Sequence, residues 1–463
     1  MFFKLSFFGL SSKFIRIIQL LYQETTCEIL HGSSRSETFS TNVGVKQGCI
    51  LSPPLFSLYI NDLPDALPCG VNVAGVNIKV LLFADDIVLL ADSPENLQKM
   101  IDAFYNYCEK WYLKVNLEKS KVVVFRKGPR ISSTLRWFYG QDLIEVVNSY
   151  KYLGINLNFN LSFKPHLNSK LSMAKMAVCS KWSSFINNNQ ISNADKLKIF
   201  DAAGRSILFY AAQVWGFQRY EDVEIFLRFY LKKMLKLPLN TPNYMLHLET
   251  GAQSLFTQTL RMHFAYIRKV LTLPSNRLPH ILACEEIRTR SFWAKDWVVL
   301  CETYQINITG LFWASKASHD IILERIVYTE RVKLIEDAKG SCFHDMYNRL
   351  SHDGQSLLAL NFPSNVTSML IKARGGLLNI NARAFKDHTD GRCTICNLNA
   401  TENTLHIIGI CPIYAYIRNS YFGVGTLNEN EVINILNGQN YIALYNYLSE
   451  VLKYRALIIN EFA

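Results

Sequence analysis

The order of apolar and polar residues predicts a chain that mixes strands and helices over its first 160 residues and is mostly helical afterwards. Apolar residues recur every three or four positions from Pro94 to Trp111, with Ser93 placed to cap a helix and Pro94 to open it. Val122–Phe125 and residues 149–157 are short runs rich in β-branched and aromatic residues, which is typical of strands. From about residue 165 the helical spacing dominates. We therefore expect an α+β fold.

The segment from Lys79 to Ala91, KVLLFADDIVLLA, is the most informative stretch. Its two apolar runs flank the adjacent carboxylates Asp85 and Asp86, which predicts a tight β-hairpin with both acids at its turn. Adjacent carboxylates on an apolar hairpin repel each other and lose hydration, so a bound cation would stabilise them. Asp-Asp is also good turn chemistry in water. The hairpin alone leaves a cation site and a solvated turn both open.

Length and charge narrow the classes of function. The chain has 463 residues, which is enough for two to four domains with their own cores. Its formal net charge of +11 and pI near 9.0 favour a polyanionic partner, nucleic acid before membrane. The longest uncharged apolar-rich stretch, Ser206–Gln218, is too short to span a bilayer, so we expect no membrane partner.

The N-terminus and the cysteines bear on the compartment. Residues 1–23 carry Lys4, Lys13 and Arg16 and no acid, as a mitochondrial transit peptide does. Apolar residues from Phe14 to Tyr22 recur at helical spacing, however, and we interpret the segment as the first helix of a domain. Eleven scattered cysteines, an odd number, indicate a reducing compartment in which most thiols are small core residues.

Two further segments could contact phosphate groups. Gly44, Lys46 and Gly48 precede a predicted helix with Ser52 as its N-cap and Pro53 as its first residue, where free backbone N–H groups can meet an anion. Turn geometry explains such a loop more often than ligand binding does. The helix predicted over Val223–Met234 carries a basic side made of Arg228, Lys232, Lys233 and Lys236. This side could follow a phosphate backbone or could simply be a solvated helix face.

Near the C-terminus, Cys393, Cys396, His406 and Cys411 have the spacing C-x2-C-x9-H-x4-C. Four such ligands with a tight first pair suit tetrahedral Zn²⁺, and with every position filled by protein the metal would be structural. The alternative is a coincidence among scattered cysteines beside a core histidine. The spacing favours zinc.

Several motifs, taken in order, resemble one family. VGVKQGCILSPPLFSLYINDL, LLFADDIVLLA, LKVNLEKSKVVVF and YKYLGI are similar to the reverse transcriptase of non-LTR (LINE-type) retrotransposons. YAAQVWGF at 210–217, LKLPLNTPNYMLHLETG at 235–251 and the Cys-Cys-His-Cys series resemble the same proteins. The resemblance covers most of the chain, from about residue 5 to 420. An ordered series of motifs is far more specific than any one of them.

The resemblance implies a partial right-hand polymerase palm, built from an antiparallel sheet with helices, and a helical thumb. The expected domains are a partial fingers and palm domain at 1–160, the thumb at 161–240, a helical linker or C-terminal region at 241–390 and a CCHC zinc knuckle at 391–420. The expected partners are an RNA template, a DNA primer or target, and dNTPs. The oligomeric state is left open, and the family is expected in the nucleus and cytoplasm.

The resemblance also implies roles for individual residues. Asp85 and Asp86 match the catalytic box and would bind Mg²⁺, which stabilises the attacking 3′-oxygen and the departing pyrophosphate. Gln47 and Gly48 match the motif that packs on the incoming nucleotide and template. Either Lys119 or Lys121 would lie near the triphosphate, and the sequence does not choose between them.

One departure from the family pattern limits what we expect of this chain. The family places another metal-binding aspartate upstream, in a strand reading roughly F-x-D-x-x-x-A-F-D, and Met1 lies some ten residues after the place where that motif should end. We therefore expect an N-terminally truncated polymerase that is inactive or nearly so by itself. The alternative is a non-catalytic nucleic-acid-binding protein retained for its basic thumb and zinc knuckle.

Overall fold

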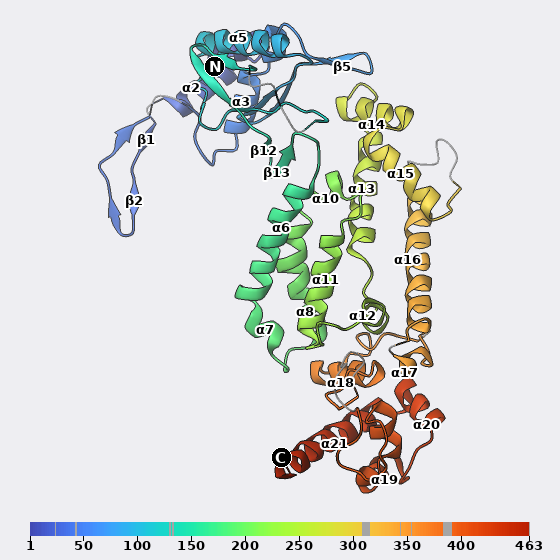
Figure 1. The fold of residues 1–463 in the computed structure, drawn as a ribbon. Helices are drawn as coiled ribbons and strands as arrows, with labels where there is room; N and C mark the ends of the chain where they lie inside the picture. The colour runs from blue at the N-terminus through green and yellow to red at the C-terminus, as the bar shows by residue number, and fades with distance from the viewer. Residues whose placement is uncertain are drawn as a thin grey trace. The chain divides into compact units, whose positions relative to one another are not determined.

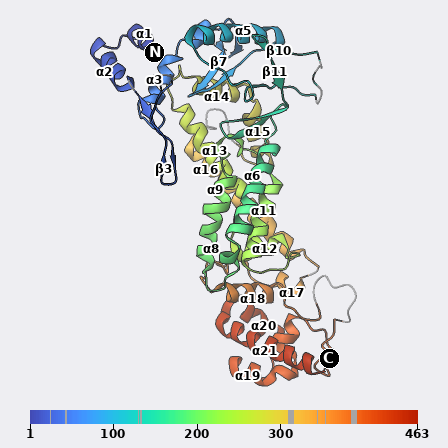
Figure 2. The same cartoon turned by 90° about the vertical axis from the view of Figure 1, so that its left-hand side faces the viewer.

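The computed structural model describes residues 1–23, 25–41, 44–128, 131, 134–307, 315–342, 344–352, 354–382 and 391–462. The chain divides into two compact units, Met1–Ser162 and Phe163–Ala463. Figures 1 and 2 draw the first unit in blue to blue-green and the second from green to red.

The first unit combines short helices with small sheets, and the predicted α+β composition is confirmed. Its helices are α1 (Phe2–Phe7), α2 (Ser12–Tyr22), α3 (Ser52–Tyr59), α4 (Leu63–Ala66) and α5 (Pro94–Trp111). Its strands are β1 (Thr26–Cys27), β2 (Leu30–His31), β3 (Ser34–Arg35), β4 (Phe39–Ser40), β5 (Val71–Val73), β6 (Val76–Ile78), β7 (Val80–Phe83), β8 (Asp86–Leu89), β9 (Lys121–Val122), β10 (Trp137–Tyr139), β11 (Asp142–Val146), β12 (Ser149–Tyr152) and β13 (Ile155–Asn158). The pairs β1–β4, β2–β3, β5–β6, β7–β8, β10–β11 and β12–β13 are antiparallel, whereas β9 and β11 pair in parallel.

Helix α5 organises the core of the first unit. Ser93 accepts a hydrogen bond from the Asn96 N–H at 3.2 Å, and Pro94 is the first helical residue, as predicted. Two clusters of buried residues include side chains of this helix: Leu63, Leu67, Met100 and Tyr107 form one, and Ile101, Val122, Trp137 and Ile144 form the other. Each fully buried side chain of this size contributes roughly 1.5–3 kcal/mol, so the clusters hold the small sheets to the helix.

A buried lysine ties the N-terminal helix to the same core. Lys4 of α1 is 3% exposed, and its ammonium donates to Asp62 Oδ1 at 2.6 Å and to the Tyr107 hydroxyl at 2.8 Å. The same nitrogen lies 3.8 Å from the centre of the Trp111 ring. A buried ammonium needs a carboxylate, hydrogen-bond acceptors or aromatic faces around it, and Lys4 has all three. Residues 1–23 thus form two helices, α1 and α2, where one was predicted, and Lys4 anchors the first of them in the core.

The second unit is helical in the part that the structure describes, as the spacing predicts. Its helices up to the Cys/His region are α6 (Lys164–Met176), η1 (Ala177–Lys181), α7 (Ser183–Asn187), α8 (Asn193–Ile199), η2 (Phe200–Arg205), α9 (Ser206–Leu208), α10 (Ala212–Trp215), α11 (Glu221–Met234), α12 (Asn243–Thr250), α13 (Leu255–Leu271), α14 (Leu278–Thr289), α15 (Phe292–Thr303), α16 (Lys316–Lys339), α17 (Asp345–Asn348) and α18 (Ser364–Arg374). They are followed by η4 (His406–Ile410), η5 (Pro412–Tyr414), α19 (Ala415–Phe422), α20 (Glu429–Asn434), η6 (Ile435–Gln439) and α21 (Tyr441–Phe462).

One cluster of buried apolar residues extends through this unit, from Phe163 to Val451. Buried charges within the unit have partners. Glu224 of α11 accepts hydrogen bonds from the first two N–H groups of α13, at Leu255 and Phe256, at 3.1 and 2.8 Å. This carboxylate caps the helix, because those N–H groups have no partner inside it. Among the described residues, no helix is both long and apolar enough to cross a membrane.

Candidate functional site

The Asp85–Asp86 hairpin forms as predicted, with one difference at its tip. Strands β7 and β8 pair with Phe83 opposite Asp86, so Ala84 and Asp85 make the turn and Asp86 begins the second strand. Ala84 has a φ of +49°, in the left-handed region that tight two-residue turns require. The prediction that both acids lie in the turn is therefore right for Asp85 only.

The hairpin is more open than the family resemblance suggested. Val80 and Ile87 pack on the cluster around Met100, but Leu81 and Phe83 are 37% and 61% exposed. Leu82 alternates onto the same face of the strand as Val80 and is also 37% exposed, so the helix covers that face only in part. Most of β7 is thus open to solvent, although its residues are apolar.

Both carboxylates are exposed and make no hydrogen bond or ion pair within the described part of the chain. Burial raises the pKa of Tyr152 in β12, and the negative charge of Asp86 raises it further. The two side chains therefore lie near each other. The structure therefore brings the YKYLGI segment toward the hairpin. No third histidine, cysteine or acidic side chain among the described residues joins the two aspartates to form a ligand group.

The structure separates the two lysines that the sequence left as alternatives. Lys121 lies in β9 and forms an ion pair with Glu145 of β11 at 2.7 Å. Lys119 is exposed, and no partner for its ammonium is found in the described residues. Only its backbone is held, because its carbonyl accepts a hydrogen bond from the Tyr150 hydroxyl at 3.0 Å. Of the two lysines, Lys119 is thus the one whose ammonium forms no ion pair within the described residues.

The loop before α3 differs from its prediction in the way that Ser52 is used. Helix α3 begins at Ser52, so Ser52 is not the N-cap, and its hydroxyl donates to the Lys46 carbonyl at 2.6 Å. This bond closes the loop on the helix. Gln47 and Gly48 lie exposed at its bend, and Gly48 has a φ of +81° that favours glycine. In the described residues, no hydrogen bond or ion pair joins Gln47 or Gly48 to the hairpin.

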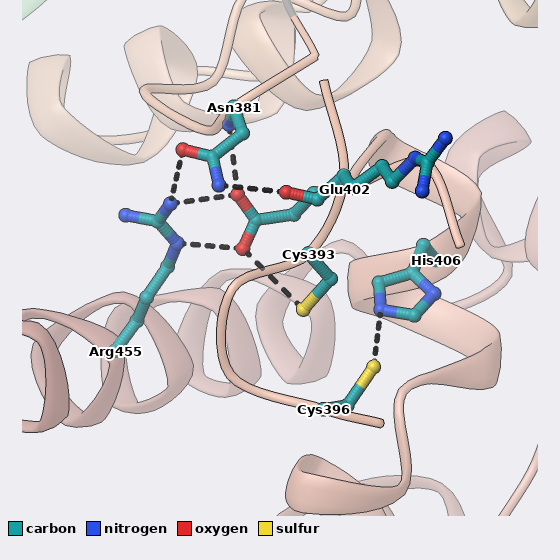
Figure 3. A network of polar contacts seen from close by, with 7 residues as sticks. Asn381, Cys393, Cys396, Glu402, His406 and Arg455 are labelled. Atoms are coloured by element: carbon teal, nitrogen blue, oxygen red, sulfur yellow. Dashed lines mark hydrogen bonds and ion pairs between the residues drawn. The ribbon is translucent and has the colours of Figure 1, made fainter. Parts of the chain in front are cut away.

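The cysteines and the histidine near the C-terminus do come together. One donor atom from each of Cys393, Cys396, His406 and Cys411 lies within 4.8 Å of the others, and all four residues are buried. Cys396 Sγ lies 3.5 Å from His406 Nε2, and the two side chains face each other in Figure 3. The Nδ1 atom of His406 is buried with no hydrogen-bond partner in the described structure.

Protonation and donor chemistry fit a metal ion. Burial raises the pKa of Cys393 and raises that of Cys411 to about 12, while it lowers the pKa of His406. These side chains are therefore neutral near pH 7 without a metal, and binding one would release thiol protons. Three sulfurs and one imidazole nitrogen, gathered in a dry site, match the preferences of structural Zn²⁺.

A buried carboxylate connects this Cys/His group to the C-terminal helix. Glu402 is fully buried and forms hydrogen-bonded ion pairs with Arg455 of α21 at 2.6 and 2.8 Å (Figure 3). The Cys393 thiol approaches the same carboxylate at 3.9 Å, and Asn381 bonds to both Glu402 and Arg455. Sequence reasoning missed Glu402 and Arg455, because no local spacing relates residues 53 positions apart.

Helices α19 and α21 support the segment that carries His406 and Cys411. Arg418 of α19 is fully buried and donates to the carbonyls of Ile408 and Cys411 at 2.6 and 3.0 Å. The hydroxyl of Tyr447, in α21, donates to the Ile407 carbonyl at 2.7 Å. Backbone carbonyls next to the ligands are thus fixed by side chains from both helices.

Comparison with known proteins identifies the first unit. Residues 2–157 match the family model described as "Reverse transcriptase (RNA-dependent DNA polymerase)". The "RNA-directed DNA polymerase from mobile element jockey" of Drosophila funebris is 26% identical over 242 residues, which are 51% of this chain and 26% of that protein. The protein of the same name from Drosophila melanogaster is 29% identical over 210 residues, 43% of this chain and 22% of that protein. Residues 2–157 are a reverse transcriptase domain that is similar to those of LINE-type retrotransposon polymerases.

This reverse transcriptase region also resembles a second type of element. The "Retrovirus-related Pol polyprotein from type-2 retrotransposable element R2DM" of Drosophila melanogaster is 30% identical over 158 residues, 32% of this chain and 15% of that protein. The chain spans about a quarter of the length of the two jockey relatives. Asp85, Asp86, Gln47, Gly48 and both lysines lie in the matched region, and the Cys/His group lies beyond it.

Proposed function

We propose that this chain is the part of an RNA-directed DNA polymerase that contains the catalytic hairpin, and that it acts on an RNA template, a DNA primer or target, and dNTPs. The observation that carries the proposal is the state of Asp85 and Asp86. They are adjacent, exposed and unbonded within the described residues, at the tip of a hairpin inside the reverse transcriptase match. Carboxylates kept free of protein partners are available to a cation.

The donor set of the hairpin suits Mg²⁺, which the reverse transcriptase family normally uses, because this ion prefers one or two carboxylates together with substrate phosphates. Asp85 and Asp86 would hold it. When bound, Mg²⁺ stabilises negative charge on the attacking 3′-oxygen and on the departing pyrophosphate. Lys119 would contact the triphosphate, while Gln47 and Gly48 would form the surface under the incoming nucleotide and template.

Primer extension tests this proposal. The assay uses a DNA primer annealed to an RNA template, with Mg²⁺ and dNTPs, and compares residues 1–463 alone with the same residues fused behind the segment that precedes the matched region in the jockey polymerase. We expect slow or undetectable extension by the chain alone, because two carboxylates without a third ligand bind metal weakly. Extension by the fusion supports the polymerase, and a fully folded fusion that never extends a primer contradicts it.

Within this proposal, residues 1–160 are a partial fingers and palm domain and residues 161–240 a helical thumb. The helices from 241 to 390 form a linker or C-terminal region. Residues 391–420 are a zinc-binding segment whose metal is structural, because its four ligands are buried and leave no open position. Zinc content near one equivalent in protein purified without chelator supports this assignment, and a Cys396→Ser variant with unchanged zinc content refutes it.

A second function is favoured by a separate observation, namely the complete and buried Cys/His group in a chain of net charge +11. The chain would then bind nucleic acid without catalysis. This function predicts salt-sensitive binding of RNA or DNA that persists when both Asp85 and Asp86 are changed to Asn. A folded, zinc-loaded sample that binds neither at low salt excludes it.

A further inference from the structure

The turn that follows the last residue of helix α11 contains an unusual residue, Lys236. The Leu237 N–H donates to the Lys232 carbonyl at 2.9 Å and the Lys236 N–H donates to the Lys233 carbonyl at 3.2 Å, which together form a Schellman motif. Lys236 takes the left-handed position of this motif, with a φ of +50°. Glycine is favoured there because it has no Cβ to strain the backbone. A lysine at this position lowers the stability of the fold. We therefore expect a role of its side chain that offsets this cost.

Two other lysines lie near Lys236, each on a different helix. Lys196 of α8 is 0% exposed, and its ammonium donates to the Ser364 hydroxyl at 3.0 Å. Burial lowers the pKa of Lys196 to about 8, and the positive charge of Lys236 contributes to this shift. Lys372 of α18 is half-buried, and burial followed by the same charge lowers its pKa as well. The charge of Lys236 therefore acts on both Lys196 and Lys372. The Ser364 hydroxyl, which accepts from Lys196, also donates to the Met234 carbonyl at 3.5 Å and so places α8 and α18 at the end of α11.

No carboxylate offsets this cluster in the described part of the chain. The Lys236 ammonium donates to the Asn189 side-chain oxygen at 2.8 Å, and the Lys196 ammonium is held by a neutral hydroxyl. Lys198 on the same helix α8, by contrast, is 78% exposed and pairs with Asp195 at 2.9 Å. Like charges that share a partly buried place without a counter-charge destabilise the fold, and an external anion would relieve that repulsion.

We propose that Lys236 and Lys372 bind a phosphodiester group of a nucleic-acid backbone, with buried Lys196 adding positive charge behind them. Lys236 is exposed and Lys372 is accessible in part, so both can reach a phosphate oxygen. Lysine binds phosphate as a point charge, without a bidentate geometry, so the site would not read the sequence. The inference rests on the proposed function, whose nucleic-acid partner it assigns to particular residues.

Substitution of Lys236 by glycine separates binding from folding. In the full zinc-loaded chain, K236G removes the charge and places the favoured residue at the left-handed position. We expect the melting temperature to stay equal or rise. We expect the affinity for a fluorescein-labelled RNA–DNA hybrid to fall about 3- to 10-fold and the slope of log affinity against log salt to shrink by about 1. Lys372→Gln should act in the same direction.

The control is Lys198→Gln, which removes the same charge from an exposed and paired lysine of α8 and should change affinity less than about 2-fold. Lys196→Met tests the buried charge and should weaken binding without lowering the melting temperature.

Single-stranded RNA and duplex DNA probes of equal length distinguish which backbone is preferred. If K236G binds as the unsubstituted chain does, this inference is wrong and the proposed function stands. If the unsubstituted chain binds no probe, the nucleic-acid partner itself is wrong.

Discussion

The Asp85–Asp86 hairpin and the Cys393–Cys411 group both gather atoms that suit a metal ion, but their surroundings differ. The aspartates are adjacent in sequence, exposed, and joined by no third ligand in the described residues. The cysteines and the histidine come from two short segments, are buried, and are supported by Glu402, Arg418 and Arg455. The first site depends on what binds to it, whereas the second is complete within its own unit.

This difference predicts where substitutions will be felt. A residue that the fold does not use can be changed at little cost to stability, even when all activity depends on it. A residue enclosed by hydrogen-bonded neighbours cannot be changed without leaving some of them unpaired. Substitutions at the hairpin should therefore change activity without changing stability. Substitutions in the Cys/His group should lower stability, and any function that depends on this unit should be lost with it.

The largest expected effect is on catalysis at the hairpin. Asp86→Asn in the extension-competent fusion should lower the rate of primer extension about 10³-fold or more, because a metal ligand is lost. The free energy of unfolding should change by less than about 0.5 kcal/mol, since the carboxylate has no partner in the described structure. Asp142→Asn, at another exposed acid of the same unit, is the control for charge. A large loss of stability in Asp86→Asn would mean that the hairpin is a structural element after all.

If zinc fills the Cys/His group as proposed, its removal should be nearly as severe for the second unit. Treatment with a chelator, or Cys396→Ser, should cost roughly 3 kcal/mol or more of folding free energy, because zinc binding contributes directly to folding. Hydrogen exchange should then rise in α19 and α21 and stay unchanged in α5. Cys284→Ser removes an exposed thiol and should have no such effect. Equal protection of α21 with and without metal would show that the helices hold the segment alone.

The Glu402–Arg455 pair sharpens the comparison further. Arg455→Met should destabilise the protein by about 3 kcal/mol, because it leaves the fully buried Glu402 carboxylate without its cation. Lys453→Met, at an exposed position of the same helix, should cost little. Adding Glu402→Met to Arg455→Met should recover part of the loss in chemical denaturation, because the unpaired charge is gone. If the second substitution adds to the first, the pair is not what holds α21.

The smallest expected effect is the loss of folding stability of the second unit at acid pH. It is measured at saturating zinc, so that release of the proposed metal does not contribute. Burial lowers the pKa of His263 to about 4, and this ring contacts the Gln213 carbonyl at 2.8 Å. Between pH 6.5 and 4 the unfolded state binds a proton that the folded state does not, so stability falls as the pH falls through this window. We expect a loss of about 2 kcal/mol between pH 7.5 and 5. His263→Phe should remove this contribution to the pH dependence in urea denaturation at saturating zinc. An unaltered slope would assign the dependence to other buried histidines, such as His247, whose pKa burial also lowers.

Local sequence patterns predict many of the helices and strands of this structure. The contacts between residues far apart in the sequence could not be predicted from such patterns. Ser93 and Pro94 start α5 because capping is a matter of neighbouring residues, and the four Cys/His ligands follow from their spacing alone. Ser52 shows the limit of such reasoning, since α3 already begins at Ser52 and Leu51 takes the N-cap position. No local pattern relates Lys4 to Asp62. Their contact depends on how helices pack, which single-sequence spacing does not encode.

The open hairpin also determines how this protein should be handled in solution. In the described residues β7 pairs only with β8, so each strand has an outer edge of unpaired N–H and C=O groups beside exposed Leu81, Leu82 and Phe83. Such an edge is a template on which a strand of another molecule can add. Concentrated samples are therefore expected to self-associate at this hairpin first. Solubility, rather than thermal stability, then sets the concentration at which the protein can be studied.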